Sequence, residues 1–153
     1  MQVYSSVLIV TLTMAGVLAA AGPPQRPKKQ FLNPEGVPKP TGYTQVVSSG
    51  SGRMIFISGQ GGADQSGQMP EAFAAQTKNT FENIGRCLKA AGARFDDIVK
   101  INYYVTDIAY TAELRRIRAG YLNQSGPPAS TLVQVGLGKG LKVEIEAIAL
   151  VPE

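Results

Sequence analysis

The chain has 153 residues, enough for one domain with its own core, and its hydrophobic content of 44% fits a soluble globular protein. It contains no His and one Cys, which excludes a Ser-His-Asp or Cys-His triad and leaves only carboxylates as further zinc ligands, so we expect no metal or cofactor. The net charge is +4. Removing four N-terminal cations (Arg26, Lys28, Lys29 and Lys39) leaves a neutral chain, which argues against a nucleic-acid-binding surface.

The N-terminal segment predicts a signal peptide over residues 1–21. Residues 1–25 carry no charged side chain, residues 7–21 are almost wholly apolar, and Ala19-Ala20-Ala21 offers the small residues of a cleavage site. On this interpretation the protein is exported, periplasmic or secreted, and keeps no membrane anchor after cleavage. Two alternatives stay open. Positive charges follow the apolar run, as in an uncleaved anchor, and Met14 or a later residue is an alternative start, which would leave the protein in the cytoplasm.

Residues 22–41 are predicted to be a basic linker, because residues 22–40 contain six prolines, and the folded domain is predicted to span 42–153. Its first elements are two short β-prone runs, at 44–49 and 54–58. Ser49-Gly50-Ser51-Gly52 lies between them, so we expect the two runs to pair as a hairpin. The glycine-rich stretch that follows, 59–68, is expected to be a loop.

A long helix is predicted from residue 71 to a stop at Gly92, with Pro70 in its first turn. Three- and four-residue steps mark its buried face: Phe73, Thr77, Thr80, Ile84, Leu88 and Ala91. A strand over 98–106 follows, then a second helix over 111–122 and strands over 130–135 and 142–151. The order β-β-α-β-α-β-β predicts an α+β fold, with two helices on one face of a mixed sheet.

The last strand contains the candidate catalytic group. Glu144 and Glu146 are two residues apart and therefore point to the same face of a strand. Apolar neighbours predict burial nearby, so a carboxylate here is expected to have a raised pKa and to act as an acid or base. Ser130 is the expected partner on the neighbouring strand. The alternative is an ordinary pair of solvated carboxylates.

Three other features have weaker chemical implications. The Ser58–Gly62 turn is glycine-rich but lacks the Gly-Lys-Ser/Thr of a nucleotide loop, so we expect it to offer backbone N–H groups to an anion or carbonyl. Arg115, Arg116 and Arg118 form a cationic run on the second predicted helix, for which a solvated face is the simpler interpretation. Cys87 is expected to be a packing residue.

Together these segments resemble the RidA family, also called the YjgF/YER057c/UK114 family, from about residue 42 to 151. The matching pieces are Thr41-Gly42-Tyr43-Thr44-Gln45, Ile57-Ser58-Gly59-Gln60, Ala75-Gln76-Thr77, Glu82-Asn83-Ile84, Ala90-Ala91-Gly92-Ala93, Asp97-Ile98-Val99-Lys100, Val105-Thr106-Asp107, Pro127-Pro128-Ala129 and Val143-Glu144-Ile145-Glu146-Ala147. The resemblance implies a chorismate-mutase-like (YjgF) fold and a homotrimer with a small-molecule ligand in clefts between subunits. It also implies a hydrolase (deaminase) that converts reactive enamines or imines into 2-oxo acids and ammonia.

By the same resemblance, Glu144 acts catalytically through a water, and Tyr43, Ser58 and Gly59 line the substrate pocket. The chain departs from the family pattern at Ser130, where an Arg is expected to hold the substrate carboxylate. Serine is short and neutral, so the bidentate clamp is lost. We hypothesise that Arg115 returns a guanidinium to the cleft, next to Ser130. The lost clamp supports an alternative function, a non-catalytic ligand-binding trimer.

Overall fold

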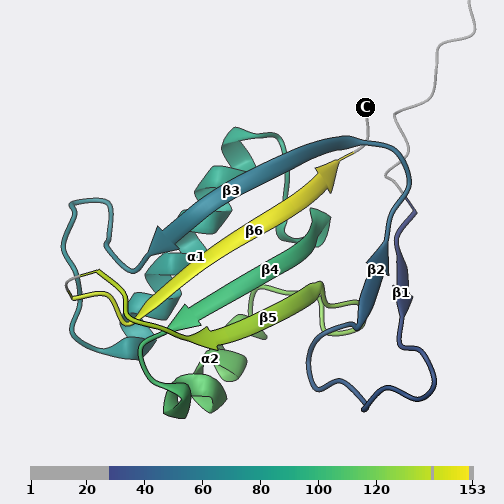
Figure 1. Cartoon of the computed structure of the whole chain (residues 1–153). Coiled ribbons are helices and arrows are strands. Elements are labelled where there is room, and N and C mark those ends of the chain that lie inside the picture. The colour runs from purple at the N-terminus through teal and green to yellow at the C-terminus, as the bar shows by residue number, and fades with distance from the viewer. Residues whose placement is uncertain (1–27, 139, 152–153) are drawn as a thin grey trace, which may run out of the picture.

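The computed structural model describes residues 28–138 and 140–151, so the predicted signal peptide at 1–21 lies outside the described residues. Four strands form one sheet in the order β3 (Arg53–Gly61), β6 (Val143–Val151), β4 (Ile98–Val105) and β5 (Ala129–Gln134). All pairs are antiparallel except β4–β5, which is parallel. The helices α1 (Phe73–Ala90) and α2 (Thr111–Arg118) cover one face and leave the other open (Figure 1). The α+β prediction, with a mixed sheet and two helices on one face, is therefore confirmed.

The predicted hairpin between the first two runs is wrong. The first run forms β2 (Val46–Ser48), which pairs with an unpredicted strand, β1 (Gln30–Leu32), in a separate two-stranded sheet. The second run forms β3 and pairs with β6 at the other end of the chain. Burial explains the choice of partner: Ile55 and Ile57 of β3 lie in the core beneath α1, whereas β2 has two exposed residues out of three and no buried face to share.

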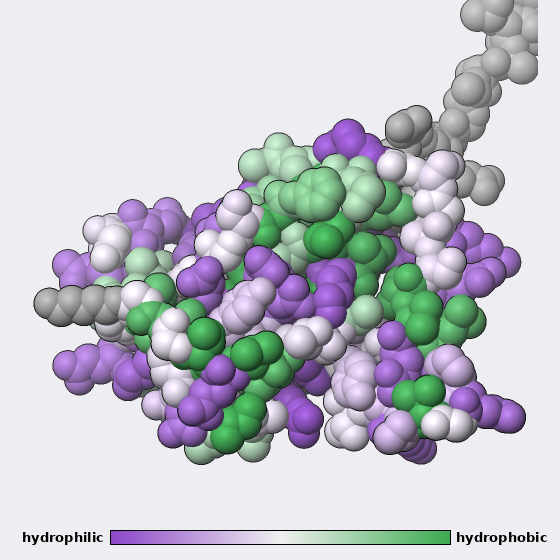
Figure 2. Space-filling model, viewed as in Figure 1, coloured by the Kyte–Doolittle hydropathy of each residue, from purple (hydrophilic) through white to green (hydrophobic). Residues whose placement is uncertain are grey.

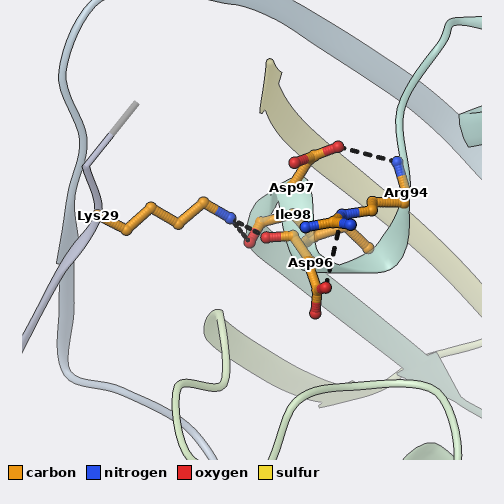
Figure 3. Close-up of polar contacts among 5 residues, drawn as sticks. All are labelled: Lys29, Arg94, Asp96, Asp97 and Ile98. Carbon is orange, nitrogen blue, oxygen red and sulfur yellow. Dashed lines mark hydrogen bonds and ion pairs between the residues drawn. The ribbon is translucent and has the colours of Figure 1, made fainter. Parts of the chain in front are cut away.

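The segment before β1 is tied to the main sheet. The ammonium group of Lys29 donates hydrogen bonds to the backbone carbonyls of Asp96 and Ile98, just where β4 begins (Figure 3). The Thr44 hydroxyl donates to the Pro127 carbonyl at 2.7 Å, which ties the loop between β1 and β2 to the turn before β5. Part of the predicted linker is thus ordered against the body.

The helix α1 supplies most of the helical part of the core. The predicted stripe is confirmed from Phe73 to Leu88, and Phe81 extends it. The buried hydroxyls of Thr77 and Thr80 donate to the carbonyls four residues earlier, at 2.8 Å each, so their burial leaves no donor unpaired. The helix begins three residues after Pro70 rather than around it, and it ends just before Gly92, whose φ of 68° only glycine adopts readily.

One buried polar side chain fixes the entry into β6. The Gln76 amide is fully buried; it donates to the carbonyls of Pro70 (2.7 Å) and Gly140 (2.8 Å) and accepts from the Lys142 N–H (2.8 Å). These bonds hold the loop before β6 against α1, two residues ahead of Glu144. Within the described ranges, neither helix has the length and apolarity that a membrane crossing requires.

The strand β4 and the helix α2 place the remaining core. The predicted strand at 98–106 is confirmed, but a register shift between Ile98 and Lys100 removes Val99 from the buried face. The buried face is therefore Ile98, Ile101, Tyr103 and Val105. The helix α2 ends at Arg118, four residues before its predicted end, and buries Leu114, Ile117 and Arg118.

Candidate functional site

The Glu144 carboxylate lies against the backbone of β3. A register shift between Ile57 and Gln60 bulges β3 at this point, and Gly59 sits in the bulge. A Cβ atom on Gly59 would overlap the Glu144 carboxylate, lying 2.8 Å from its Cδ atom, so only glycine admits this approach. Glu144 makes no hydrogen bond or ion pair with any residue that the structure describes, and Ser58 beside the bulge is exposed. The carboxylate is therefore available to a water or ligand.

Glu146 has different surroundings on the same face. Its Oε1 atom accepts hydrogen bonds from the Asn102 amide and the Tyr104 hydroxyl, at 2.8 Å each. The Asn102 and Tyr104 hydrogen bonds stabilise the ionised form and hold the pKa of Glu146 below its usual value. The predicted raised pKa is therefore wrong for Glu146, because hydrogen bonding outweighs burial. Of the two carboxylates, Glu144 alone remains without a polar partner among the described residues.

Ser130 does not lie opposite Glu144 within one chain, so that expectation is wrong. Ser130 pairs with Ile101 on the helix-covered face of the sheet, whereas Glu144 pairs with Tyr104 on the open face. One strand separates β5 from β6, so the two residues are also roughly 10 Å apart across the sheet. The alternation of side chains along the intervening strand β4 sets the two faces, and the sequence pattern alone did not reveal this register.

Ser130 instead lines a cavity of about 220 Å³ at the β5 edge of the sheet. Its walls are Thr41, Tyr43, Tyr103, Arg115, Arg118, Ser130 and Leu132. Three residues proposed from the sequence, Tyr43, Arg115 and Ser130, are thus brought together. The other three, Ser58, Gly59 and Glu144, belong to the open face. The candidate site is divided between two faces of one chain.

Sequence reasoning missed Arg118 and Tyr103 as members of this cavity. Arg118 is buried, donates to the Gly42 carbonyl at 2.6 Å, and lies over the Tyr103 ring with its Cζ atom 5.6 Å from the ring centroid. A signal existed in the sequence. Leu114, Ile117 and Arg118 are spaced i, i+3, i+4 and share one stripe of α2, which sets Arg118 apart from the exposed Arg115 and Arg116.

A larger cavity, of about 540 Å³, lies beside the small β1–β2 sheet. Its walls are mostly prolines and uncharged polar side chains, and Lys39 is the only charged residue among those that line it. It shares Tyr43 with the smaller cavity but contains no carboxylate, so it lacks a general base. No group of three or more potential metal-ligating side chains occurs within residues 28–138 and 140–151.

Comparison with known proteins shows the family to which the chain belongs. Residues 37–151 match the family described as Endoribonuclease L-PSP. A 2-iminobutanoate/2-iminopropanoate deaminase of Bos taurus is 40% identical over 110 residues, covering 71% of this chain and 79% of that protein. The solved structure of RidA from the Antarctic bacterium Psychrobacter sp. PAMC 21119 is 37% identical, with a TM-score of 0.62 over 79% of this chain and 98% of that one. Escherichia coli TdcF with bound serine is 32% identical, with a TM-score of 0.59 over 79% and 98% of the two chains. The chain therefore belongs to the Endoribonuclease L-PSP family, which includes the RidA, YjgF and RutC proteins.

Proposed function

We propose that this protein hydrolyses small 2-imino acids, or their enamine tautomers, to 2-oxo acids and ammonia. The observation that carries the proposal is the unpartnered Glu144 carboxylate held against Gly59 in the β3 bulge. Two relatives support the substrate class. The similar Bos taurus protein is a 2-iminobutanoate/2-iminopropanoate deaminase, and the TdcF structure contains serine, a molecule of the same size that also has a carboxylate beside its nitrogen-bearing carbon.

The reaction requires one positioned base and one water. Glu144 accepts a proton as the water oxygen bonds to the imine carbon, and the C=N π electrons move to nitrogen, which takes up a proton. The resulting carbinolamine then expels ammonia. Its C–N bond breaks as the hydroxyl becomes a carbonyl and its proton passes through Glu144 to the departing amine, so the net change is addition of water and loss of ammonia.

We propose further that the working enzyme is a homotrimer with its site between subunits. A single subunit keeps Glu144 and Ser130 on opposite faces, so a ligand that contacts both must bridge two copies. The open face also carries exposed apolar side chains, with Met54 54% and Phe56 71% exposed. Figure 2 views this face, with apolar surface gathered over β3 and polar surface nearer the middle of the sheet. Packing against further copies would remove this apolar surface from water.

The non-catalytic alternative rests on Ser130. Without an arginine at that position the protein would bind a small ligand on the same trimer and release it unchanged. A carboxylate-bearing substrate would then be weakly held, and Glu144 would serve only in ligand contact.

One assay separates the two functions. 2-Iminopropanoate and 2-iminobutanoate are generated in situ by an amino-acid oxidase, and 2-oxo acid formation is followed with wild type, Glu144→Gln and Glu146→Gln. Glu146→Gln is the matched control, since it changes a carboxylate of the same strand and face that is already hydrogen-bonded to Asn102 and Tyr104. Enzyme-dependent turnover that only Glu144→Gln abolishes supports the deaminase. A rate equal to buffer for wild type on both substrates supports the binding protein.

A further inference from the structure

Arg118 is a buried cation without an acidic partner. Its side chain is 8% exposed, and no ion pair joins it to any Asp or Glu in the described part of the chain. Its neighbours on α2 behave differently: Arg116 is exposed and lies 3.6 Å from Glu113. Burying a charge is costly unless a counter-charge or a full set of hydrogen bonds compensates. A buried guanidinium that lacks an anion points to one supplied from outside the chain.

The groups around Arg118 orient it without neutralising it. One Nη2 hydrogen bond, 2.6 Å long, goes to the Gly42 carbonyl, and the Cζ atom lies over the Tyr103 ring, 5.6 Å from its centroid. Gly42 has a φ of 72°, and a Cβ atom there would overlap the Arg118 guanidinium. Both partners are electrically neutral. The Arg118 guanidinium is therefore fixed in place. A guanidinium has five N–H donors, so donors that are not bonded to Gly42 remain for a ligand.

A second group in the same cavity lacks a hydrogen-bond acceptor. The Tyr103 hydroxyl is buried in a side chain that is 1% exposed; the Arg118 guanidinium lies close enough to affect it, but no described residue accepts its proton in a hydrogen bond of normal geometry. Burial raises the pKa of Tyr103 to about 12, against the opposing effect of the nearby Arg118 charge, so the hydroxyl stays protonated and can donate. Unpaired buried hydroxyls are uncommon, because an unmade hydrogen bond costs stability. Ser130 contributes another hydroxyl to the cavity wall.

We propose that Arg118, Tyr103 and Ser130 form a binding site for the carboxylate of a small 2-oxo or 2-imino acid. The inference rests on the proposed function and assigns its carboxylate subsite. The guanidinium lost at Ser130 is replaced from α2, by a buried arginine rather than by the exposed Arg115. The part of the cavity that one chain forms, about 220 Å³, is smaller than the roughly 300–1,000 Å³ typical of drug-sized ligands, which suits a few-carbon acid.

The position of Arg115 indicates a different role in ligand binding from that of Arg118. It lines the same cavity but remains exposed to solvent, where water and salt screen its charge. Its charge attracts an anion toward the opening, and the buried Arg118 holds it. Arg118 substitutions are therefore expected to weaken equilibrium binding in high and low salt alike, whereas Arg115 substitutions act mainly at low salt.

The test measures binding of pyruvate, the product-like 2-oxo acid, by calorimetry or NMR titration of the full chain. Pyruvamide, its uncharged analogue, is titrated in parallel. Arg118→Met is expected to weaken pyruvate binding at least about tenfold and pyruvamide binding much less, because the attraction between opposite charges is lost only for the acid. Arg116→Met is the matched control on the same helix and is expected to bind pyruvate like wild type.

Two further variants test the same site if the Arg118→Met protein does not fold. Tyr103→Phe keeps the ring beneath the guanidinium and removes only the hydroxyl. Arg118→Lys keeps the positive charge but removes the planar set of N–H donors. Both are expected to weaken pyruvate binding several-fold. Wild-type affinity in these variants, or no pyruvate binding by wild type, overturns the carboxylate site even if the protein deaminates imines. Arg118-dependent pyruvate binding without turnover leaves the site standing and rejects the deaminase.

Discussion

The carboxylate of Glu144 and the backbone of Gly59 are in direct contact across β6 and β3, at a bulge that leaves no room for a Cβ atom. The Gly59→Ala variant is therefore expected to push the carboxylate out of position and lower kcat about 10- to 100-fold on 2-iminopropanoate, since small displacements of a catalytic group are costly. Gly50→Ala is the matched control, because nothing lies within 4 Å of a Cβ atom at Gly50. Equal rates for the two variants would show that the contact does not position Glu144.

The pKa of Glu146 predicts how stability depends on pH. Its hydrogen bonds to Asn102 and Tyr104 hold the folded-state pKa below the unfolded value of 4.5. Such a group stabilises the fold above the unfolded pKa and loses that contribution as pH falls through the folded pKa. Wild type should thus lose more stability between about pH 5 and pH 3 than Glu146→Gln does. Urea unfolding of both proteins across this pH range measures the difference. If the free energies of unfolding of the two proteins fell in parallel with pH, the prediction would be contradicted.

The regular elements were largely predictable from local patterns. The α1 stripe from Phe73 to Leu88 follows helical spacing, and the strands β4 and β6 follow apolar alternation, so burial of one face fixed their type. The pairing of the strands could not be predicted from local patterns. The turn at 49–52 suggested a hairpin, but Ile55 and Ile57 reach the core only when β3 pairs with β6.

The candidate site was predictable in its residues more than in its arrangement. Glu144 and Ser130 came from the strand pattern, and Gly59 and Tyr43 from motif resemblance, but the register of β4 with its two neighbours decides that Glu144 and Ser130 occupy different faces. The burial of Arg118 was not predicted, because three arginines close together on one helix suggest a solvated face. Only its i+4 spacing from Leu114 distinguishes it, and its lack of an acidic partner is a property of three-dimensional packing.

A rescue experiment follows from the proposed carboxylate site. Ser130→Arg, placed in the Arg118→Met background, returns a guanidinium to the same cavity from β5. The double variant is expected to recover at least about threefold in pyruvate affinity over the single variant. Thr131→Arg in that background is the matched control, since Thr131 pairs with Asn102 on the opposite face and is expected to restore nothing. Equal recovery from both arginines would indicate a general charge effect.

The open sheet face predicts the oligomeric state. Phe56 of β3 is 71% exposed on the open face of the sheet, so Phe56→Glu is expected to convert a trimer into monomers by placing a charge in the interface. Light scattering coupled to gel filtration measures the mass of both proteins. Gln65→Glu, in the exposed loop after β3, carries the same added charge and should leave the mass unchanged. A wild-type protein that elutes as a monomer would contradict the proposed assembly.

The central claim is that Glu144 activates water for imine hydrolysis, and its most direct test is the rate of 2-oxo acid formation from freshly generated 2-iminopropanoate. Wild type and Glu146→Gln are expected to accelerate the reaction well above buffer, and Glu144→Gln to lose about 100-fold or more in kcat, the range expected for removal of a general base. Circular dichroism spectra of the three proteins should coincide. A Glu144→Gln variant that turns over 2-iminopropanoate at the wild-type rate would contradict the account.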